Sequence, residues 1–166
     1  MSGSGLPQVV VHTDGGCRGN PGLGAWACIL DHAGLRWERS GAVPDTTNNR
    51  MELQAAIEAL RLLNRPCQVA LHTDSDYLRQ GITAWIRGWK RNGWMTSTRD
   101  PVKNRDLWEE LDRLAAPHAV QWQWLKGHAG HPLNERCDIL ANRAMDSFRR
   151  LGGGRVDREE AGRPAG

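Results

Sequence analysis

Apolar positions along the chain group into short runs that favour β-strands. These runs are Val9–Asp14, Gly22–Asp31, Leu35–Val43, Cys67–Thr73 and Val120–Leu125. The first run is apolar at successive positions, which is typical of a strand buried on both faces in the middle of a sheet. Only short or glycine-rich connections separate the first three runs, so we expect antiparallel hairpins among them.

Apolar residues at helical spacing predict helices between the later strands. Thr47 fits an N-cap, and the helix that it opens runs to about Leu63, where Asn64–Pro66 ends it. Further helices are predicted after Asp74, over 104–116 and over 133–149. Because a helix connects the third strand to the fourth, a right-handed crossover should place the fourth strand beside the first and parallel to it. The predicted fold is α/β, with a mixed five-stranded sheet, three strands antiparallel and two parallel, flanked by helices.

The chain has 166 residues, enough for one domain that buries a core without disulfides or a structural metal. We assign residues 8–150 to this domain and expect a flexible N-terminus over 1–7. The tail over 151–166 is rich in glycine and charged residues, and we expect it to be disordered.

Cysteine usage and the lack of a long apolar stretch bear on the cellular location. The four cysteines are scattered, with no C-x-x-C pair and no metal-ligand spacing, which favours free thiols in a reducing compartment. The N-terminal segment lacks a basic stretch followed by an apolar one, and no segment approaches the roughly 20 apolar residues of a membrane span. We therefore expect a cytoplasmic protein that does not associate with membranes.

Charge favours an anionic partner, since the net charge is +3 and the isoelectric point is near 8.9. The chain also has eight tryptophans against one tyrosine and one phenylalanine. Most of these tryptophans should belong to the core, and only those interleaved with Lys and Arg over 85–94 call for another explanation.

Four acidic residues are predicted to converge on one edge of the sheet. Asp14 and Asp74 end the first and fourth strands, each in the sequence His-Thr-Asp, and parallel neighbours place such residues at the same edge. Glu52 and Asp138 share the apolar stripes of their helices, so both should face the protein interior. Each acid has an ordinary alternative: a turn residue for Asp14, an N-cap for Asp74, and half-exposed charges for Glu52 and Asp138. Together, however, four converging acids would repel one another unless a cation binds, and Mg²⁺ or Mn²⁺ suits carboxylate oxygens.

Several motifs in order carry a resemblance to a known family. They are Thr13–Gly22 (TDGGCRGNPG), Thr47–Glu52 (TNNRME), Thr73–Ser75 (TDS), Lys126–Pro132 (KGHAGHP) and Asn134–Asp138 (NERCD). From about Val9 to Phe148 the chain resembles a bacterial type 1 ribonuclease H. The resemblance implies a ribonuclease H-like catalytic domain with a mixed five-stranded sheet, and an endonuclease that hydrolyses the RNA strand of an RNA–DNA hybrid. It also implies a monomer with the hybrid duplex as its partner.

The resemblance assigns catalytic roles to five residues. Asp14, Glu52, Asp74 and Asp138 match the four metal-binding carboxylates of the family, and His128 matches its catalytic histidine, which assists proton transfer or product departure. The implied cofactor is Mg²⁺, two ions with substrate, with Mn²⁺ as a substitute. In such a mechanism one metal activates the attacking water and the other stabilises the departing oxygen, which gives 5′-phosphate and 3′-hydroxyl ends. Asp14 is the best candidate to bridge the metals, and the ordinary alternative for His128 is a surface histidine in a loop.

Amide side chains beside the acids are candidates for recognition of the RNA strand. Asn20, Asn48 and Asn49 lie on glycine-rich or helix-opening segments, where amides reach the ribose 2′-hydroxyl and base edges of the minor groove. By resemblance, Cys17 also lines the path of the RNA.

The resemblance places further residues along the DNA strand. Thr47 and Asn104 match a pocket for a DNA phosphate. The resemblance also implies a basic protrusion, with aromatic residues along the DNA strand and cations along its phosphates, and it is matched by Trp85, Trp89, Lys90, Arg91 and Trp94. Packing in the core is the alternative for Trp89 and also for Trp94.

The chain departs from the family at three positions. Asn92 and Met95 stand where bacterial relatives often have basic residues, and Asp45 stands where many have arginine. Two other functions share parts of this pattern: a nuclease of the same fold with another substrate, such as a DNA resolvase or an exonuclease, and a hybrid-binding module without catalysis. The first would lack the motifs around Thr47 and His128, and the second would be expected to have lost a carboxylate.

Overall fold

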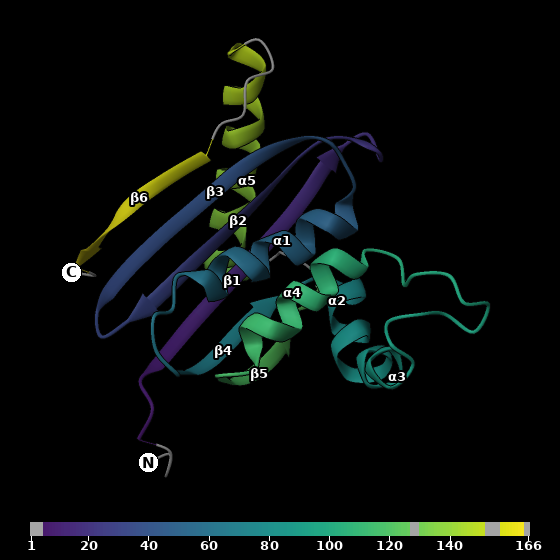
Figure 1. Ribbon diagram of the computed structural model, residues 1–166. Coiled ribbons are helices and arrows are strands. Elements are labelled where there is room, and N and C mark those ends of the chain that lie inside the picture. Colours follow the sequence, from purple (N-terminus) through teal and green to yellow (C-terminus); the bar gives the residue numbers. More distant parts are fainter. Residues whose placement is uncertain (1–4, 127–129, 152–156, 165–166) are drawn as a thin grey trace.

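The computed structural model describes residues 5–126, 130–151 and 157–164 (Figure 1). Its strands are β1 (Gln8–Arg18), β2 (Gly22–His32), β3 (Leu35–Thr46), β4 (Gln68–Thr73), β5 (Ala119–Trp124) and β6 (Asp157–Pro164). Its helices are α1 (Asn48–Arg61), α2 (Asp76–Gln80), α3 (Ile86–Arg91), α4 (Arg105–Ala115) and α5 (Pro132–Arg150), with a π-helical turn over Gly81–Trp85 between α2 and α3. Among the described residues, no helix has the length and apolar character that a membrane span needs.

The strands form one mixed sheet in the order β5-β4-β1-β2-β3-β6. The pairs β1–β2 and β2–β3 are antiparallel, and the pairs β1–β4 and β4–β5 are parallel. This confirms the predicted mixed arrangement of the first five strands. The crossover from β3 through α1 to β4 produces the parallel pairing, as expected for such a connection.

The sixth strand corrects the expectation of a disordered tail over 151–166. Within that tail, Asp157–Pro164 pairs with β3 in antiparallel register (Figure 1). Without β6, β3 would be an edge strand with a row of unpaired backbone N–H and C=O groups. Backbone pairing at an edge does not require apolar side chains, so composition does not reveal it.

β1 also extends further than predicted. The strand continues through the two glycines after Asp14 to Arg18, because its pairing with β2 extends to the contact between Arg18 and Leu23. On the other side of β1, the parallel pairing with β4 stops at His12 and His72. Asp14 therefore lies in a strand, at the level where the parallel neighbour ends.

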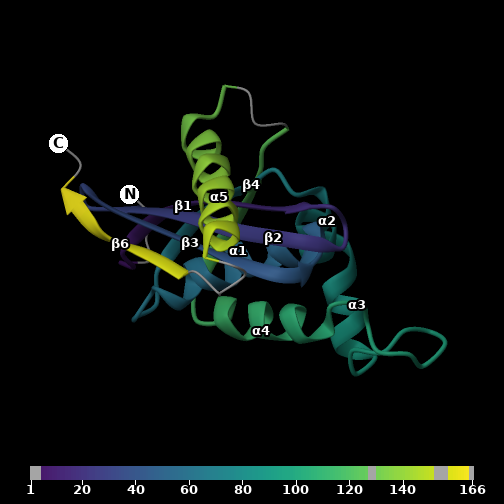
Figure 2. The ribbon, with the colours of Figure 1, turned by 90° about the horizontal axis from the view of Figure 1, so that it is seen from above.

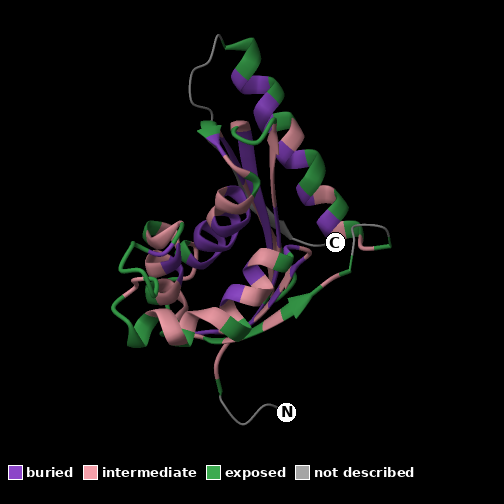
Figure 3. Cartoon of the chain, turned by 90° about the vertical axis from the view of Figure 1, so that its right-hand side faces the viewer, coloured by how far each residue is buried: buried purple, intermediate pink, exposed green. Residues whose placement is uncertain are grey.

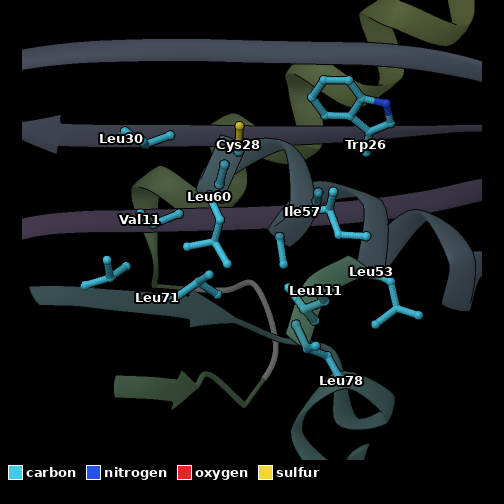
Figure 4. Close-up of a cluster of buried hydrophobic side chains, with 14 of the residues drawn as sticks. Val11, Trp26, Cys28, Leu30, Leu53, Ile57, Leu60, Leu71, Leu78 and Leu111 are labelled. Atoms are coloured by element: carbon cyan, nitrogen blue, oxygen red, sulfur yellow. The ribbon is translucent and has the colours of Figure 1, made fainter. Parts of the chain in front are cut away.

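Helices cover both faces of the sheet (Figure 2). α1 packs on β1 and β2, with α4 alongside it, and α5 packs on the opposite face across β1, β2 and β3. Figure 4 shows the first of these two apolar layers, in which Val11 and Leu71 of the strands meet Ile57 and Leu60 of α1. Each fully buried leucine or isoleucine of this kind contributes about 1.5–3 kcal/mol relative to an exposed one.

The start of α1 is fixed by Thr47, as predicted. The Thr47 side chain accepts a hydrogen bond from the Arg50 backbone N–H at 3.2 Å, which satisfies one of the free donors of the first turn. Every residue of α1 from Met51 to Leu60 except Gln54 is buried, because the sheet and α4 both pack on the helix (Figure 3), and Glu52 is among them. The cap at Thr47 fixes where α1 begins, and the burial of the helix then brings the acidic side chain of Glu52 into the interior.

Candidate active site

Three acidic side chains meet at one edge of the sheet. Asp14 comes from β1, Glu52 from α1 and Asp74 from the residue directly after β4, and one carboxylate oxygen of each lies within 4.8 Å of the others. The parallel register that pairs His12 with His72 carries both aspartates to this edge, because each follows two residues later. The predicted convergence of these three acids is thus present in the structure.

A glycine allows α1 to approach β1 closely enough for Glu52 to join the group. A Cβ atom on Gly15 would lie 2.3 Å from the backbone carbonyl carbon of Met51 and 2.5 Å from the backbone nitrogen of Glu52. Real Cβ atoms do not make contacts this short, so any other residue would push the helix away. In return, the Gly15 backbone N–H donates to Oε1 of Glu52 at 3.1 Å.

Burial and mutual repulsion change the protonation of these acids. Burial raises the pKa of Asp14 to about 8, and the charges of Asp74 and Asp138 add to this effect. Burial, followed by the charges of Asp14 and Asp74, raises the pKa of Glu52 well above its ordinary value, although the Gly15 N–H opposes the shift. At neutral pH the group therefore holds protons that a cation would displace.

The donor set fits a hard divalent cation. Only Oε1 of Glu52 has a hydrogen-bond partner, and Oε2, also buried, has none among the described residues. Buried acceptors of this kind are normally satisfied, and one that is left without a partner beside two other carboxylates points to a ligand. Oxygen atoms of carboxylates are the ligands that Mg²⁺ and Mn²⁺ prefer.

Asp138 reaches the group from a different direction than predicted. The sequence placed it on one stripe with Ala141, Met145 and Phe148, and these three residues are buried, but Asp138 itself is exposed and the neighbouring Cys137 is buried. Asp138 lies beside that stripe, near the start of α5, and its charge helps to raise the pKa of the Asp14 carboxyl group. The fourth acid thus approaches Asp14 from the solvent side.

A polar group lies on the α5 side of β1, next to the acids. Nδ1 of His12 is 2.6 Å from Oδ1 of Asn134, and the His12 ring stacks on that of His72. Burial lowers the pKa of His12, so its neutral form is favoured. The sequence alone indicates no role for these side chains, although the repeated His-Thr-Asp pattern includes both histidines.

The asparagines expected to contact RNA lie next to one another. The Asn48 backbone N–H donates to Oδ1 of Asn20 at 3.2 Å, which joins the turn between β1 and β2 to the start of α1. Asn20 and Asn48 are exposed, and Asn49 is partly exposed. Cys17 is also partly exposed, and its Sγ donates to the backbone oxygen of Thr46 at 3.2 Å.

Asn104 belongs to a network that ties α4 to the start of α1. Its Oδ1 accepts from Arg50 at 3.2 Å, and its Nδ2 donates to the Tyr77 hydroxyl at 3.1 Å. Arg50 in turn forms a two-pronged ion pair with Asp106. Arg50 follows Thr47 by one turn, so the structure brings Thr47 and Asn104 to the same region, through a contact of Arg50 that the sequence did not predict.

The aromatic and the basic residues of the 85–94 segment differ in how far they are buried. Trp85, Trp89 and Trp94 are partly buried, and Trp89 contacts the rings of Trp85, Trp94 and the fully buried Trp108. Lys90 and Arg91 are exposed, although Lys90 pairs with Asp112 at 3.2 Å. The protrusion therefore has an aromatic interior and cationic side chains at its surface. His128 lies outside the described residues.

Comparisons with known proteins agree on one family. The sequence profile of the RNase H family matches residues 7–146. Ribonuclease HI of Caulobacter vibrioides is 60% identical over 139 residues, which cover 84% of this chain and 93% of that protein. Ribonuclease H of Chelativorans sp. (strain BNC1) is 54% identical over 157 residues, covering 95% and 97% of the two chains.

Solved structures share the fold. LC9-RNase H1, described as a type 1 RNase H with the type 2 active-site motif, has a TM-score of 0.78 and 34% sequence identity, and the match covers 95% of this chain and 80% of that one. LC11-RNase H1, solved in complex with an RNA/DNA hybrid, has a TM-score of 0.65 and 20% identity, with 85% of this chain and 99% of that chain covered.

Proposed function

The chain belongs to the ribonuclease H family, whose enzymes cleave RNA in RNA–DNA hybrids, and we propose that it does so by a two-metal mechanism. Its products would carry 5′-phosphate and 3′-hydroxyl ends. The observation that carries the proposal is the group of Asp14, Glu52 and Asp74, with a buried carboxylate oxygen that lacks a partner in the described chain. A module that only bound hybrids would not need a group of buried acids that repel one another.

Asp14, Glu52, Asp74 and Asp138 are the residues that would hold the metal. Two Mg²⁺ ions, or Mn²⁺ in their place, would supply an activated water and stabilise charge on the leaving oxygen. Asp14 is close to Glu52 and Asp74, and the charges of Asp74 and Asp138 both raise its pKa, so it is the acid that would bind metal most directly. His128 would move a proton or assist product departure, which is the role of the matching histidine in the family.

Discrimination between RNA and DNA would come from the amide side chains next to the acids. Asn20, Asn48 and Asn49 would contact the ribose 2′-hydroxyl and base edges, with Cys17 along the same strand. The exposure of Asn20 and Asn48, and the hydrogen bond that holds them together, support this role.

The DNA strand would follow a second path across the protein. Thr47 and Asn104 would hold a DNA phosphate, and Lys90 and Arg91 would pair with phosphates beyond it, with Trp85 and Trp89 beneath them. The network from Arg50 through Asn104 to Tyr77 supports a rigid pocket. The hybrid complex of LC11-RNase H1, which has the same fold, supports a duplex of this kind as partner.

Cleavage of matched duplexes tests the proposal. An RNA–DNA hybrid, an RNA duplex and a DNA duplex of one sequence would be incubated with the protein in Mg²⁺, in Mn²⁺ and in chelator, and the product ends would be analysed. We expect metal-dependent cleavage of the RNA strand in the hybrid alone, with 5′-phosphate and 3′-hydroxyl ends. Preferential cleavage of the DNA duplex would indicate a DNA nuclease of the same fold, and equal cleavage in chelator would refute the role of the acids.

A further inference from the structure

We propose that Asn134 is a positioning residue that sets how far Asp138 reaches toward Asp14, and this inference rests on the proposed metal-dependent function. Asn134 lies in the first turn of α5, and Asp138 follows it by about one helical turn. Asn134 is 0% exposed, whereas Asp138 is exposed. The buried amide of Asn134 is therefore fixed by its surroundings, whereas the carboxylate of Asp138, one turn later, lies at the surface.

Both ends of the Asn134 amide are bonded to β1. Oδ1 lies 2.6 Å from Nδ1 of His12, and Nδ2 donates to the backbone oxygen of Thr13 at 3.2 Å. Because Oδ1 can only accept, His12 donates through its Nδ1–H, and its ring carries the proton on that nitrogen. The amide thus holds α5 against the two residues that precede Asp14.

The contact continues from β1 to β4. The rings of His12 and His72 stack with their centroids 4.5 Å apart and their planes 10° from parallel. Nδ1 of His72 donates to the backbone oxygen of Val11 at 3.2 Å, which fixes the second ring. A polar row of Asn134, His12 and His72 therefore joins α5, β1 and β4.

Each of the three residues in this row is followed closely along the chain by one of the acids. Asp14 comes two residues after His12, and Asp74 comes two residues after His72. Asp138 follows Asn134 by one helical turn. A shift of α5 relative to β1 would change the separation of Asp138 from Asp14, whereas it would leave the separation of Asp14 from Asp74 unchanged. The amide acts on the fourth acid through the position of the helix.

A second polar contact of α5 supplies a control. Arg136, two residues after Asn134, donates to both oxygens of Glu38 on β3 at 2.9 and 3.0 Å. This ion pair also ties the start of α5 to the sheet, but its acid lies on β3. Loss of the ion pair should cost stability, and it should not move Asp138 relative to Asp14.

The test compares Asn134→Ala with Arg136→Met in two measurements. Calorimetry of Mn²⁺ binding to the protein without hybrid reports the site directly, and steady-state cleavage reports kcat, KM and the Mg²⁺ requirement. For Asn134→Ala we expect Mn²⁺ affinity to fall about tenfold, the size of effect seen for residues that orient metal ligands, with kcat reduced and KM for hybrid unchanged. For Arg136→Met we expect wild-type Mn²⁺ affinity and a lower unfolding temperature.

A second variant keeps the test decisive if Asn134→Ala does not fold. His12→Phe removes the donor to Asn134 but fills the same space and retains a ring to stack on His72, and it should weaken Mn²⁺ binding in the same way. Unchanged Mn²⁺ affinity in a folded Asn134→Ala protein, or in His12→Phe, would overturn the inference. A wild-type protein that binds Mn²⁺ but does not cleave hybrid would instead refute the proposed function, and the affinities of the variants would still decide the role of Asn134.

Discussion

The backbone N–H of Gly15 donates to one oxygen of Glu52 at 3.1 Å, and the other oxygen of that carboxylate is buried without a partner among the described residues. One oxygen of the Glu52 carboxylate is thus satisfied by the protein, and the other is available to a ligand. The same glycine makes the approach of α1 to β1 possible, since a side chain at position 15 would overlap the backbone of Met51. Gly15 therefore fixes the position of Glu52, and its N–H opposes the rise in the pKa of that carboxyl group that burial causes.

Gly15→Ala should damage both stability and activity. The added Cβ would lie 2.3 Å from a backbone carbon of Met51, so α1 must move away from β1 and take Glu52 with it. We expect a loss of about 2 kcal/mol or more in the free energy of unfolding, measured with urea, and at least a tenfold loss of cleavage.

Gly16→Ala is the matched control, because a Cβ there would meet nothing within 4 Å. Its unfolding free energy should stay within about 1 kcal/mol of wild type. If the two variants had equal stability, the close approach of α1 to β1 at Gly15 would not be a constraint on this fold.

Stability of the metal-free protein should fall as pH rises through the neutral range. The pKa of Asp14 is raised from 3.8 to about 8 on folding, so the folded protein keeps a proton that the unfolded chain has lost. The stability that this proton contributes is complete below pH 3.8 and is lost as pH rises toward 8. For one such group the slope is up to about 1.4 kcal/mol per pH unit.

Comparison of wild type with Asp14→Asn removes the contribution of titrating groups that lie away from the acids, and leaves that of Asp14 together with its effect on Glu52. Urea unfolding between pH 5 and pH 8 in chelator should show the wild type losing stability relative to the variant as pH rises. Added Mg²⁺ should stabilise the wild type at pH 8 and have little effect on the variant. Equal pH slopes for the two proteins would mean that Asp14 is ionised throughout this range.

Much of this arrangement could be predicted from local sequence. The cap at Thr47 and the repeated His-Thr-Asp pattern act over a few residues, and they correctly predicted the start of α1 and the edge where Asp14 and Asp74 meet. What local sequence could not predict depends on neighbours that are distant along the chain. The close approach at Gly15 requires knowledge of where α1 crosses β1.

Two errors have the same origin. Helical spacing placed Asp138 on the inward stripe, but the buried side of α5 was determined by the sheet beneath it, and Asp138 lies just outside that side. The tail reads as disordered from its composition, yet Asp157–Pro164 pairs with the edge of β3 through its backbone. Both outcomes depend on tertiary contacts that residue type alone does not specify.

Replacing Asp45 with arginine should tighten hybrid binding. Asp45 is exposed two residues before Thr47, and its negative charge would repel a DNA phosphate held at Thr47. For Asp45→Arg we expect higher affinity and a salt dependence of log K that is steeper by about one unit, as for one added phosphate contact. Turnover at saturating hybrid should barely change, because the site lies away from the acids.

Asp45→Asn separates loss of the acid from gain of the cation. Asp45 has a φ of 52°, a left-handed conformation that asparagine tolerates well, so this variant should keep the local backbone. Its affinity should rise without a change in salt slope. Parallel salt lines with equal affinity for wild type and Asp45→Arg would show that the DNA phosphate is held elsewhere.

His128→Ala should lower kcat and leave KM for hybrid nearly unchanged. The family role of this histidine is in proton transfer or product departure, and both follow binding. Steady-state kinetics on a labelled hybrid would measure both constants. A change confined to KM would place His128 in substrate recognition.

The most direct test of the central claim is single-turnover cleavage of an RNA-labelled hybrid by Asp14→Asn, with hybrid binding measured in parallel. The substitution removes the charge at the centre of the acid group but keeps the size of the side chain. We predict wild-type hybrid affinity with cleavage reduced below about one per cent of wild type, at every Mg²⁺ concentration, since loss of a group that holds the catalytic ion costs several kcal/mol of transition-state stabilisation. Cleavage by this variant at more than a few per cent of the wild-type rate would contradict the claim that these carboxylates hold the metal that cleaves RNA.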